Sequence, residues 1–147
     1  MHRFIPFNSN DEIAAIARGL ADRTLPKTAW THAAHFASAL WLFHSGVECF
    51  REMPRMIRAY NEATGVANTD SSGYHETITM ASLHAARAFL AERPACPLFE
   101  TCNVLLASPL GESNWLLAYW SRPLLFSVEA RRRWLDPDLA AFPYAQI

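Results

Sequence analysis

The sequence predicts an all-α protein, a compact bundle of about six helices that forms a single domain over residues 1–147. Apolar residues recur at helical spacing in several segments, and capping residues, glycines and prolines separate those segments. No segment shows the alternation of apolar and polar residues that is typical of a β-strand. The chain is 51% hydrophobic and 18% charged, so it can bury a core, and no linker divides it.

The first two helices follow from their caps and their apolar spacing. Residues 8–11, Asn-Ser-Asn-Asp, supply a cap for an amphipathic helix that carries Ile13, Ile16 and Leu20. After the break at Pro26, a second helix is expected through Phe43, and it is apolar on almost all sides. A helix of that kind belongs in the middle of a domain.

The remaining helices are bounded by loops and prolines. A third helix is expected over about residues 50–60, and a fourth over about residues 74–91, after a loop rich in Ser, Asp and Gly. We expect the second, third and fourth helices to pack up-down-up as the core. Prolines at 94, 97, 109 and 123 predict three shorter helices, at about residues 98–107, 113–120 and 128–134.

Charge and cysteine content indicate the environment of the protein. The net charge is −1, so we expect no nucleic-acid partner, and the run Arg131–Arg133 is interpreted as a solvated helix face. The longest apolar stretch, residues 29–43, is shorter than the ~20 residues that span a bilayer, so no membrane partner is expected. The first residues do not resemble a signal peptide, and three cysteines suit free thiols, so we expect a cytoplasmic protein.

Histidines mark the place where a function is expected. His32 and His35 are three residues apart at the start of the second helix, so both lie on one face together with apolar residues. His75 and Glu76 open the fourth helix in a similar way. If the second and fourth helices are parallel, their first turns lie at the same end of the bundle, and these four residues converge.

Three histidines and a carboxylate suggest a metal centre. His32, His35, His75 and Glu76 suit one divalent transition metal, Zn²⁺, Fe²⁺, Mn²⁺ or Ni²⁺, with water in an open position. Such a site favours a metal-dependent enzyme, with hydrolysis as a possible reaction and Glu76 as ligand or general base. The side chains expected nearby, as a ligand-binding surround, are Trp30, Tyr60, Asn61, Asp70 and Tyr74.

Two other interpretations explain the same residues. One is a metal-free module that binds a small polar molecule, with Trp30 or Tyr74 as an apolar wall. The other is a structural or interaction protein, in which His75 and Glu76 cap a helix and His32 bonds a carbonyl in the Leu25 to Thr28 connection. The aromatic residues of the C-terminal third are interpreted as core or as a homodimer surface, with a ligand-stacking role as the alternative; they are Trp115, Trp120, Phe126 and Trp134.

Three motifs resemble a family of small bacterial proteins. They are Trp-Thr-His-Ala-Ala-His at residues 30–35, Gly-Tyr-His-Glu-Thr-Ile-Thr at residues 73–79, and Leu-Leu-Phe-Ser-Val-Glu-Ala-Arg at residues 124–131, followed by Asp136-Pro137-Asp138-Leu139. The resemblance implies a helical fold and places the histidine pair and the Tyr-His-Glu segment in one pattern. It implies no particular reaction.

Overall fold

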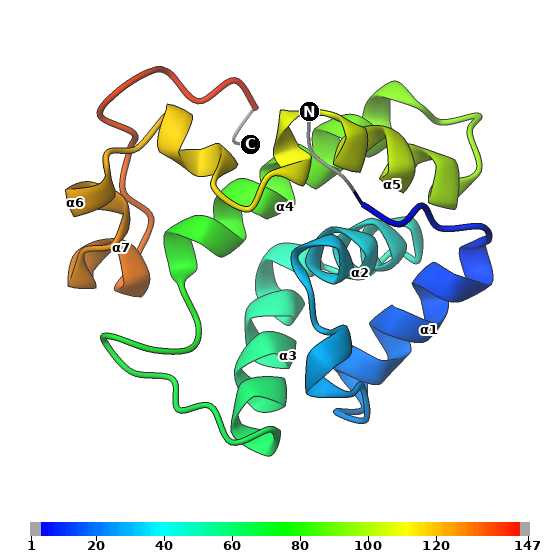
Figure 1. Cartoon of the computed structure of the whole chain (residues 1–147), viewed down its shortest axis with the longest axis horizontal. Helices are drawn as coiled ribbons and strands as arrows, with labels where there is room; N and C mark the ends of the chain where they lie inside the picture. The colour runs from blue at the N-terminus through cyan, green and yellow to red at the C-terminus, as the bar shows by residue number, and fades with distance from the viewer. Residues whose placement is uncertain (1–3, 145–147) are drawn as a thin grey trace.

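The computed structural model describes residues 4–144, and within them the secondary structure is entirely helical, which confirms the predicted fold class (Figure 1). Short 3₁₀ turns join the α-helices. In chain order the elements are α1 (Asn10–Ala21), η1 (Lys27–Ala29), α2 (His32–His44), α3 (Cys49–Ala63), α4 (Glu76–Glu92), α5 (Leu98–Ala107), η2 (Pro109–Gly111), η3 (Trp115–Ala118), α6 (Arg122–Leu125) and α7 (Val128–Arg132).

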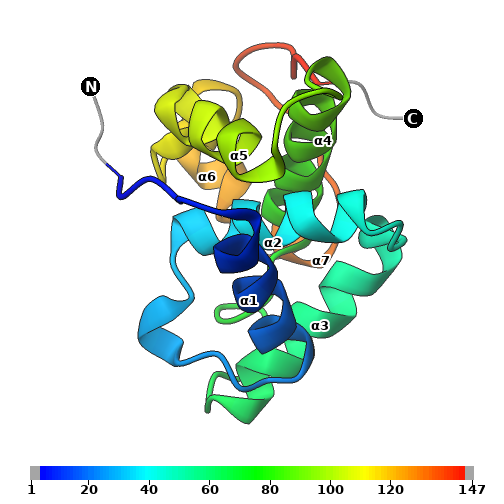
Figure 2. The ribbon, with the colours of Figure 1, turned by 90° about the vertical axis from the view of Figure 1, so that its right-hand side faces the viewer.

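Helix α2 is the centre of the molecule, as its apolar composition predicts. It contacts α1, α3, α4 and α5, and Figure 2 shows it crossing the middle of the fold. Phe36 and Leu40 on this helix are 1% and 0% exposed. Burying side chains of this size contributes about 1.5–3 kcal/mol each, so α2 is the element on which the other helices assemble.

The two helix starts that carry the histidines lie later in the chain than the sequence predicts. Residues 27–29 form a separate 3₁₀ turn, and α2 begins only at His32, where the Thr31 side chain accepts a hydrogen bond from the Ala34 N–H. Helix α4 begins at Glu76, and His75 itself is the N-cap. Both histidine segments therefore sit at capped helix ends, where backbone N–H groups need partners.

Helices α2, α3 and α4 contact one another. Figures 1 and 2 show that the three helices cross obliquely. The first turns of α2 and α4 nevertheless line one cavity together with residues of α3.

One expected helix is shorter than predicted, and another was not foreseen. The segment expected as a helix at residues 113–120 contains only the 3₁₀ turn η3. The extra helix α6 has Pro123 in its first turn, where the missing N–H costs nothing. The predicted cap Ser127 is confirmed, because its side chain accepts from the Ala130 N–H at the start of α7.

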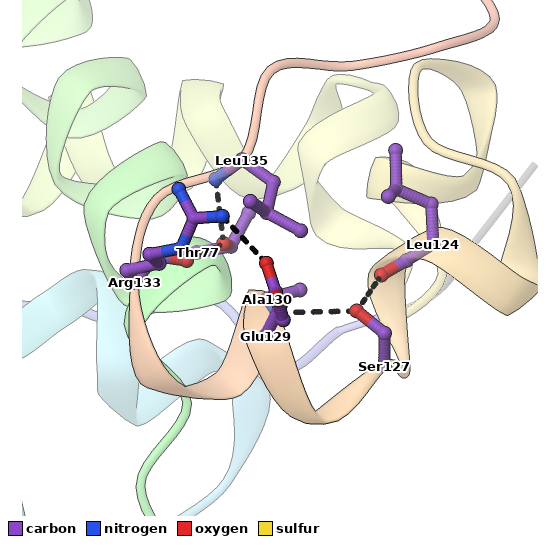
Figure 3. A network of polar contacts seen from close by, with 7 residues as sticks. All are labelled: Thr77, Leu124, Ser127, Glu129, Ala130, Arg133 and Leu135. Carbon is purple, nitrogen blue, oxygen red and sulfur yellow. Dashed lines mark hydrogen bonds and ion pairs between the residues drawn. The ribbon is translucent and has the colours of Figure 1, made fainter.

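The segment after α7 is fastened to α4 by a shared hydroxyl. Thr77 donates to the Arg133 carbonyl at 2.8 Å and accepts from the Leu135 N–H at 3.2 Å. Figure 3 shows this junction beside the Ser127 cap, with Thr77 on α4 and Leu135 on the chain that leaves α7. Thr77 is fully buried, so both bonds form away from water and fix the C-terminal part of the fold on α4.

The aromatic residues of the C-terminal third mostly form core within the chain. Trp115 and Trp120 are 6% and 0% exposed, and the Trp120 indole donates to the Leu135 carbonyl at 2.8 Å. This confirms the core interpretation for those two residues. Phe126 differs because its side chain is 55% exposed. The predicted homodimer through this region stays a prediction.

The loop before α4 depends on a glycine. Gly73 has φ +78°, and a Cβ at this position would lie 2.6 Å from the Ala67 carbonyl oxygen and 2.6 Å from Asn68 Oδ1. Only glycine combines this backbone conformation with so close an approach. Asn68 Oδ1 in turn accepts from the Tyr74 N–H at 3.0 Å, so the loop delivers Tyr74 and His75 to the head of α4 in a defined position.

Over residues 4–144, none of the helices has both the length and the apolar content needed to cross a membrane.

Candidate functional site

A cavity of about 530 Å³ lies where the heads of α2 and α4 meet α3, η3 and α6. Its walls are mainly apolar, with aromatic side chains from several elements. Its polar lining includes three histidines and one arginine. The aromatic lining residues are Trp30, Phe36, Tyr74, Trp115 and Phe126, and the histidines and arginine are His32, His35, His75 and Arg122. A cavity of this size and composition is typical of a site for a small molecule.

His75 uses both ring nitrogens to hold the fold. Its Nδ1 accepts from the Ile78 N–H at 3.2 Å, and its Nε2 donates to the Leu125 carbonyl at 2.7 Å. The first bond caps α4, which confirms the capping interpretation for this residue. The second bond joins α4 to α6. Burial lowers the pKa of His75, against the opposing effect of the Leu125 carbonyl, so the ring is neutral at neutral pH.

His32 joins α2 to the segment after α5. Its Nε2 donates to the Leu110 carbonyl at 2.7 Å, so the expected carbonyl in the Leu25 to Thr28 connection is not its partner. The reason is tertiary, because η2 lies against the head of α2 and offers a carbonyl there. The Nδ1 atom of His32 makes no hydrogen bond within residues 4–144.

His35 is held by its own helix start. Its Nδ1 donates to the Thr31 carbonyl at 2.8 Å, and its ring lies against the Trp30 ring with 3.8 Å between centroids. This bond leaves Nε2 with its lone pair, and that atom makes no hydrogen bond to the described part of the chain. His35 therefore presents an unused acceptor in a cavity with apolar walls.

The charge state of His35 follows from its surroundings. Burial lowers its pKa from 6.5 to about 4, the Thr31 carbonyl acts in the opposite direction, and nearby His32 adds a further decrease. At neutral pH the ring is therefore uncharged. A base with so low a pKa is weak, because general-base catalysis works best with a pKa near the working pH. Its chemistry suits accepting a hydrogen bond better than removing a proton.

Tyr74 and Glu76 pair with each other at the head of α4. The Tyr74 hydroxyl donates to Glu76 Oε1 at 2.6 Å, and Arg58 Cζ lies 4.2 Å from the centre of the Tyr74 ring. Burial, followed by the bond to Glu76, raises the pKa of Tyr74, so its hydroxyl stays protonated. Tyr74 is among the residues that line the cavity, whereas Glu76 is not.

The other residues expected near the site divide between the cavity and the surface. Trp30 and Asn61 line the cavity. Tyr60 lies behind Trp30, with ring centroids 5.5 Å apart, and its hydroxyl donates to the Leu25 carbonyl. Asp70 is exposed and forms an ion pair with Arg132 at 2.6 Å, and the bond from Arg132 lowers its pKa. The structure thus brings together His32, His35 and His75, and it leaves Tyr60, Asp70 and Glu76 outside the cavity lining.

The metal hypothesis stays a prediction. Within residues 4–144 there is no group of three or more His, Cys, Asp or Glu side chains placed to hold a metal ion. His75 has no nitrogen to spare, while His32 and His35 each retain one.

Sequence analysis missed Arg122 as a cavity residue and favoured a core or dimer surface over a ligand contact for Phe126. Arg122 opens α6 and Phe126 directly follows it, and the place of α6 beside α4 depends on the bond from His75 to the Leu125 carbonyl. Their only sequence signal is a lone arginine and a phenylalanine around Pro123, in a segment too short for apolar periodicity to assign a face.

The chain matches no protein-family model, no curated protein and no solved structure. The family resemblance therefore rests on the three sequence motifs alone, and the cavity has to be interpreted from its own chemistry.

We predict that replacing His75 destabilises the protein through two separable bonds. His75→Ala removes the cap of α4 and leaves the Leu125 carbonyl without a donor, so the free energy of unfolding falls by about 2–4 kcal/mol. His75→Asn keeps a capping oxygen but cannot reach Leu125, so it loses about 1 kcal/mol less. Urea denaturation measures the free energy of unfolding of both variants. The control is His44→Ala, at an exposed position at the end of α2. Equal losses for Ala and Asn would contradict the capping role.

We predict a second effect, on the pH dependence of stability. The pKa of His35 is about 4 in the folded protein against 6.5 in the unfolded chain, so the unfolded chain binds the proton more readily. The contribution of neutral His35 is therefore fully present above pH 6.5 and is lost as pH falls toward 4, by up to about 3 kcal/mol. Urea denaturation across this range should show a shallower fall for His35→Gln than for wild type. This assignment would be overturned if the pH dependence of the free energy of unfolding were unchanged in His35→Gln but altered in His44→Gln.

Proposed function

We propose that this protein binds a small, largely apolar molecule in the cavity between the heads of α2 and α4, and that His35 Nε2 accepts a hydrogen bond from it. One observation carries the proposal. The Thr31 carbonyl fixes the His35 tautomer, which leaves an unused acceptor among aromatic walls. A ligand with a hydroxyl or N–H group would satisfy that nitrogen and bury its apolar body at the same time.

The surrounding rings support a flat or aromatic body for this ligand. Trp30, Phe36 and Trp115 line the cavity, and Phe36 and Trp115 lie 6.4 Å apart between ring centroids. Aromatic walls gain from offset or edge-to-face contact with a further ring, beyond the area that is buried. Neutral His35 adds hydrogen-bonding capacity without a charge that would have to be desolvated.

A reducing location agrees with the proposal and with the expected cytoplasmic protein. Cys49 and Cys102 are buried free thiols and Cys96 is an exposed one. Unpaired cysteines support a cytosolic setting over a secreted one.

The binding test uses 2-naphthol, which has an O–H donor, and 2-methoxynaphthalene, which has the same rings without a donor. Wild-type protein should bind both, and 2-naphthol about two- to tenfold more tightly, because only it can donate to His35. His35→Phe should abolish this preference while retaining the apolar binding. Titration calorimetry measures the affinities, and the absence of saturable 2-naphthol binding would refute the proposed function.

A pocket-filling variant shows where the probe binds. Ser82 lines the cavity, and its hydroxyl donates to the Ile78 carbonyl within α4. Ser82→Leu therefore fills part of the cavity without leaving a buried donor unpaired. Ser45 bonds the Trp41 carbonyl in the same way at the exposed end of α2, so Ser45→Leu is the matched control. Only Ser82→Leu should weaken the binding of both naphthalene probes.

A metal centre is the second candidate function, favoured by the spare nitrogens of His32 and His35. The two rings are close enough for His32 to affect the pKa of His35, and both line the cavity. Two imidazoles could hold one Zn²⁺, Fe²⁺, Mn²⁺ or Ni²⁺ ion, with water or a bound molecule in the other positions. Such an ion would supply Lewis-acid chemistry, including hydrolysis.

Metal analysis separates the two candidates. Protein purified without a histidine tag should contain stoichiometric metal if the second candidate is right, and His35→Ala should lose it while His44→Ala keeps it. Wild-type protein that holds no metal and gains no thermal stability from added Zn²⁺, Mn²⁺ or Ni²⁺ would count against the metal centre and leave metal-free binding in place.

A further inference from the structure

Arg122 is a charged group that the proposed hydrogen-bond site does not use. It is the first residue of α6, is exposed, and lines the same cavity as His35. Its guanidinium group makes no hydrogen bond and no ion pair with the described residues. Among the residues that the structure describes, no Asp, Glu or Lys side chain lines the cavity. An arginine without a partner at the wall of an apolar cavity is suited to bind an anion from solution.

A second arginine adds positive potential on the same side. Arg131 on α7 donates to the carbonyl of Gly73 at 3.0 Å and to the carbonyl of Tyr74 at 3.3 Å, and both residues line the cavity. These acceptors are neutral, so the charge of Arg131 is not cancelled by an ion pair. Its effect reaches the cavity wall, because Arg131 contributes to the lowered pKa of His75.

Three acidic side chains near this wall have partners other than Arg122. Asp70 is paired with Arg132, and Glu76 accepts the Tyr74 hydroxyl. Asp138 accepts from the N–H and the hydroxyl of Ser121, next to Arg122, and none of the three lines the cavity.

The two recognition groups come from different sides of the cavity. Figure 1 shows α2 and α6 on opposite sides of the first turn of α4, and His35 belongs to α2 whereas Arg122 belongs to α6. Exposed Phe126, at the end of α6, adds an apolar surface beside Arg122. A ligand that uses both groups therefore has a donor at one end and an anion at the other.

We infer that the ligand is an apolar or aromatic carboxylate, with its carboxylate bound by Arg122 and its hydroxyl or N–H group donating to His35. This inference rests on the proposed binding function and names its ligand class. A carboxylate fits because the planar guanidinium of arginine can donate two parallel hydrogen bonds to it. The carboxylate end stays near solvent at exposed Arg122, so its desolvation is limited, and the apolar body fills the cavity.

The test extends the naphthalene series by one group. The probes are 6-hydroxy-2-naphthoate and its neutral primary amide, and a flexible pair, 3-(4-hydroxyphenyl)propionate and its amide, covers a different spacing between the two ends. In at least one pair, wild-type protein should bind the carboxylate about five- to tenfold more tightly than the amide, as titration calorimetry would show. Raising the salt concentration should weaken binding of the carboxylate and leave the amide unaffected.

Variants assign the preference to Arg122. Arg122→Gln should reduce the affinity for the carboxylate to that of the amide, and Arg122→Lys should retain part of the preference. Arg55→Gln removes the same charge from an exposed position on α3 that does not line the cavity, so it should change neither affinity. Because Arg122 is exposed and unpaired, its variants should keep the wild-type melting temperature.

The outcomes separate this inference from the function on which it rests. If 2-naphthol binds but carboxylate and amide bind equally in both pairs, the carboxylate assignment is wrong and the binding function stands. If Arg122→Gln weakens carboxylate and amide alike, Arg122 does not recognise the charge, and the assignment is overturned. If neither the carboxylates nor 2-naphthol bind, both proposals fail.

Discussion

The structure depends on the requirement that buried backbone carbonyls find a donor, and two imidazole rings meet it at the starts of α2 and α4. His32 bonds the buried residue Leu110 and His75 bonds the buried residue Leu125, both at 2.7 Å. The His35 ring adds a third bond, at 2.8 Å, to the Thr31 carbonyl, which also accepts from the His35 N–H. Two of these bonds join separate elements, because His32 ties α2 to η2 and His75 ties α4 to α6. An unpaired buried carbonyl costs about 1–3 kcal/mol, so these bonds keep the walls of the cavity in place.

The same bonds determine which chemistry remains. A carbonyl can only accept, so each histidine nitrogen that bonds one is a donor, and the other nitrogen keeps its lone pair. For His75 that lone pair caps α4, whereas for His35 it has no partner in the described part of the chain. Burial keeps His35 neutral. The cavity thus has a fixed, neutral acceptor at α2 and, at α6, an arginine without a partner in the described residues, and these two groups are suited to orient a ligand more than to transform one.

Part of the candidate site could be predicted from the sequence. The three-residue spacing of His32 and His35, and the position of His75 at the start of a helix, are local properties, and all three rings line one cavity. Tyr60, Asp70 and Glu76 were expected beside them because they are close in sequence or lie at the same helix end. Instead they bond Leu25, Arg132 and Tyr74, respectively, and do not line the cavity. These contacts depend on the exact rotation of each helix. Arg122 could not be predicted, because nothing local assigns a face to a four-residue helix.

Local sequence patterns predicted the helical class, the central position of α2, a cap within residues 8–11 and the cap Ser127, because periodicity and capping act between residues a few positions apart. The packed fold decided what His32 and His75 do. Leu110 is 78 residues from His32, and Leu125 is 50 residues from His75, so these carbonyls come within reach only when the helices pack. His35 differs, because its carbonyl partner Thr31 is four residues away, and what the fold adds there is the burial of the ring in the cavity wall.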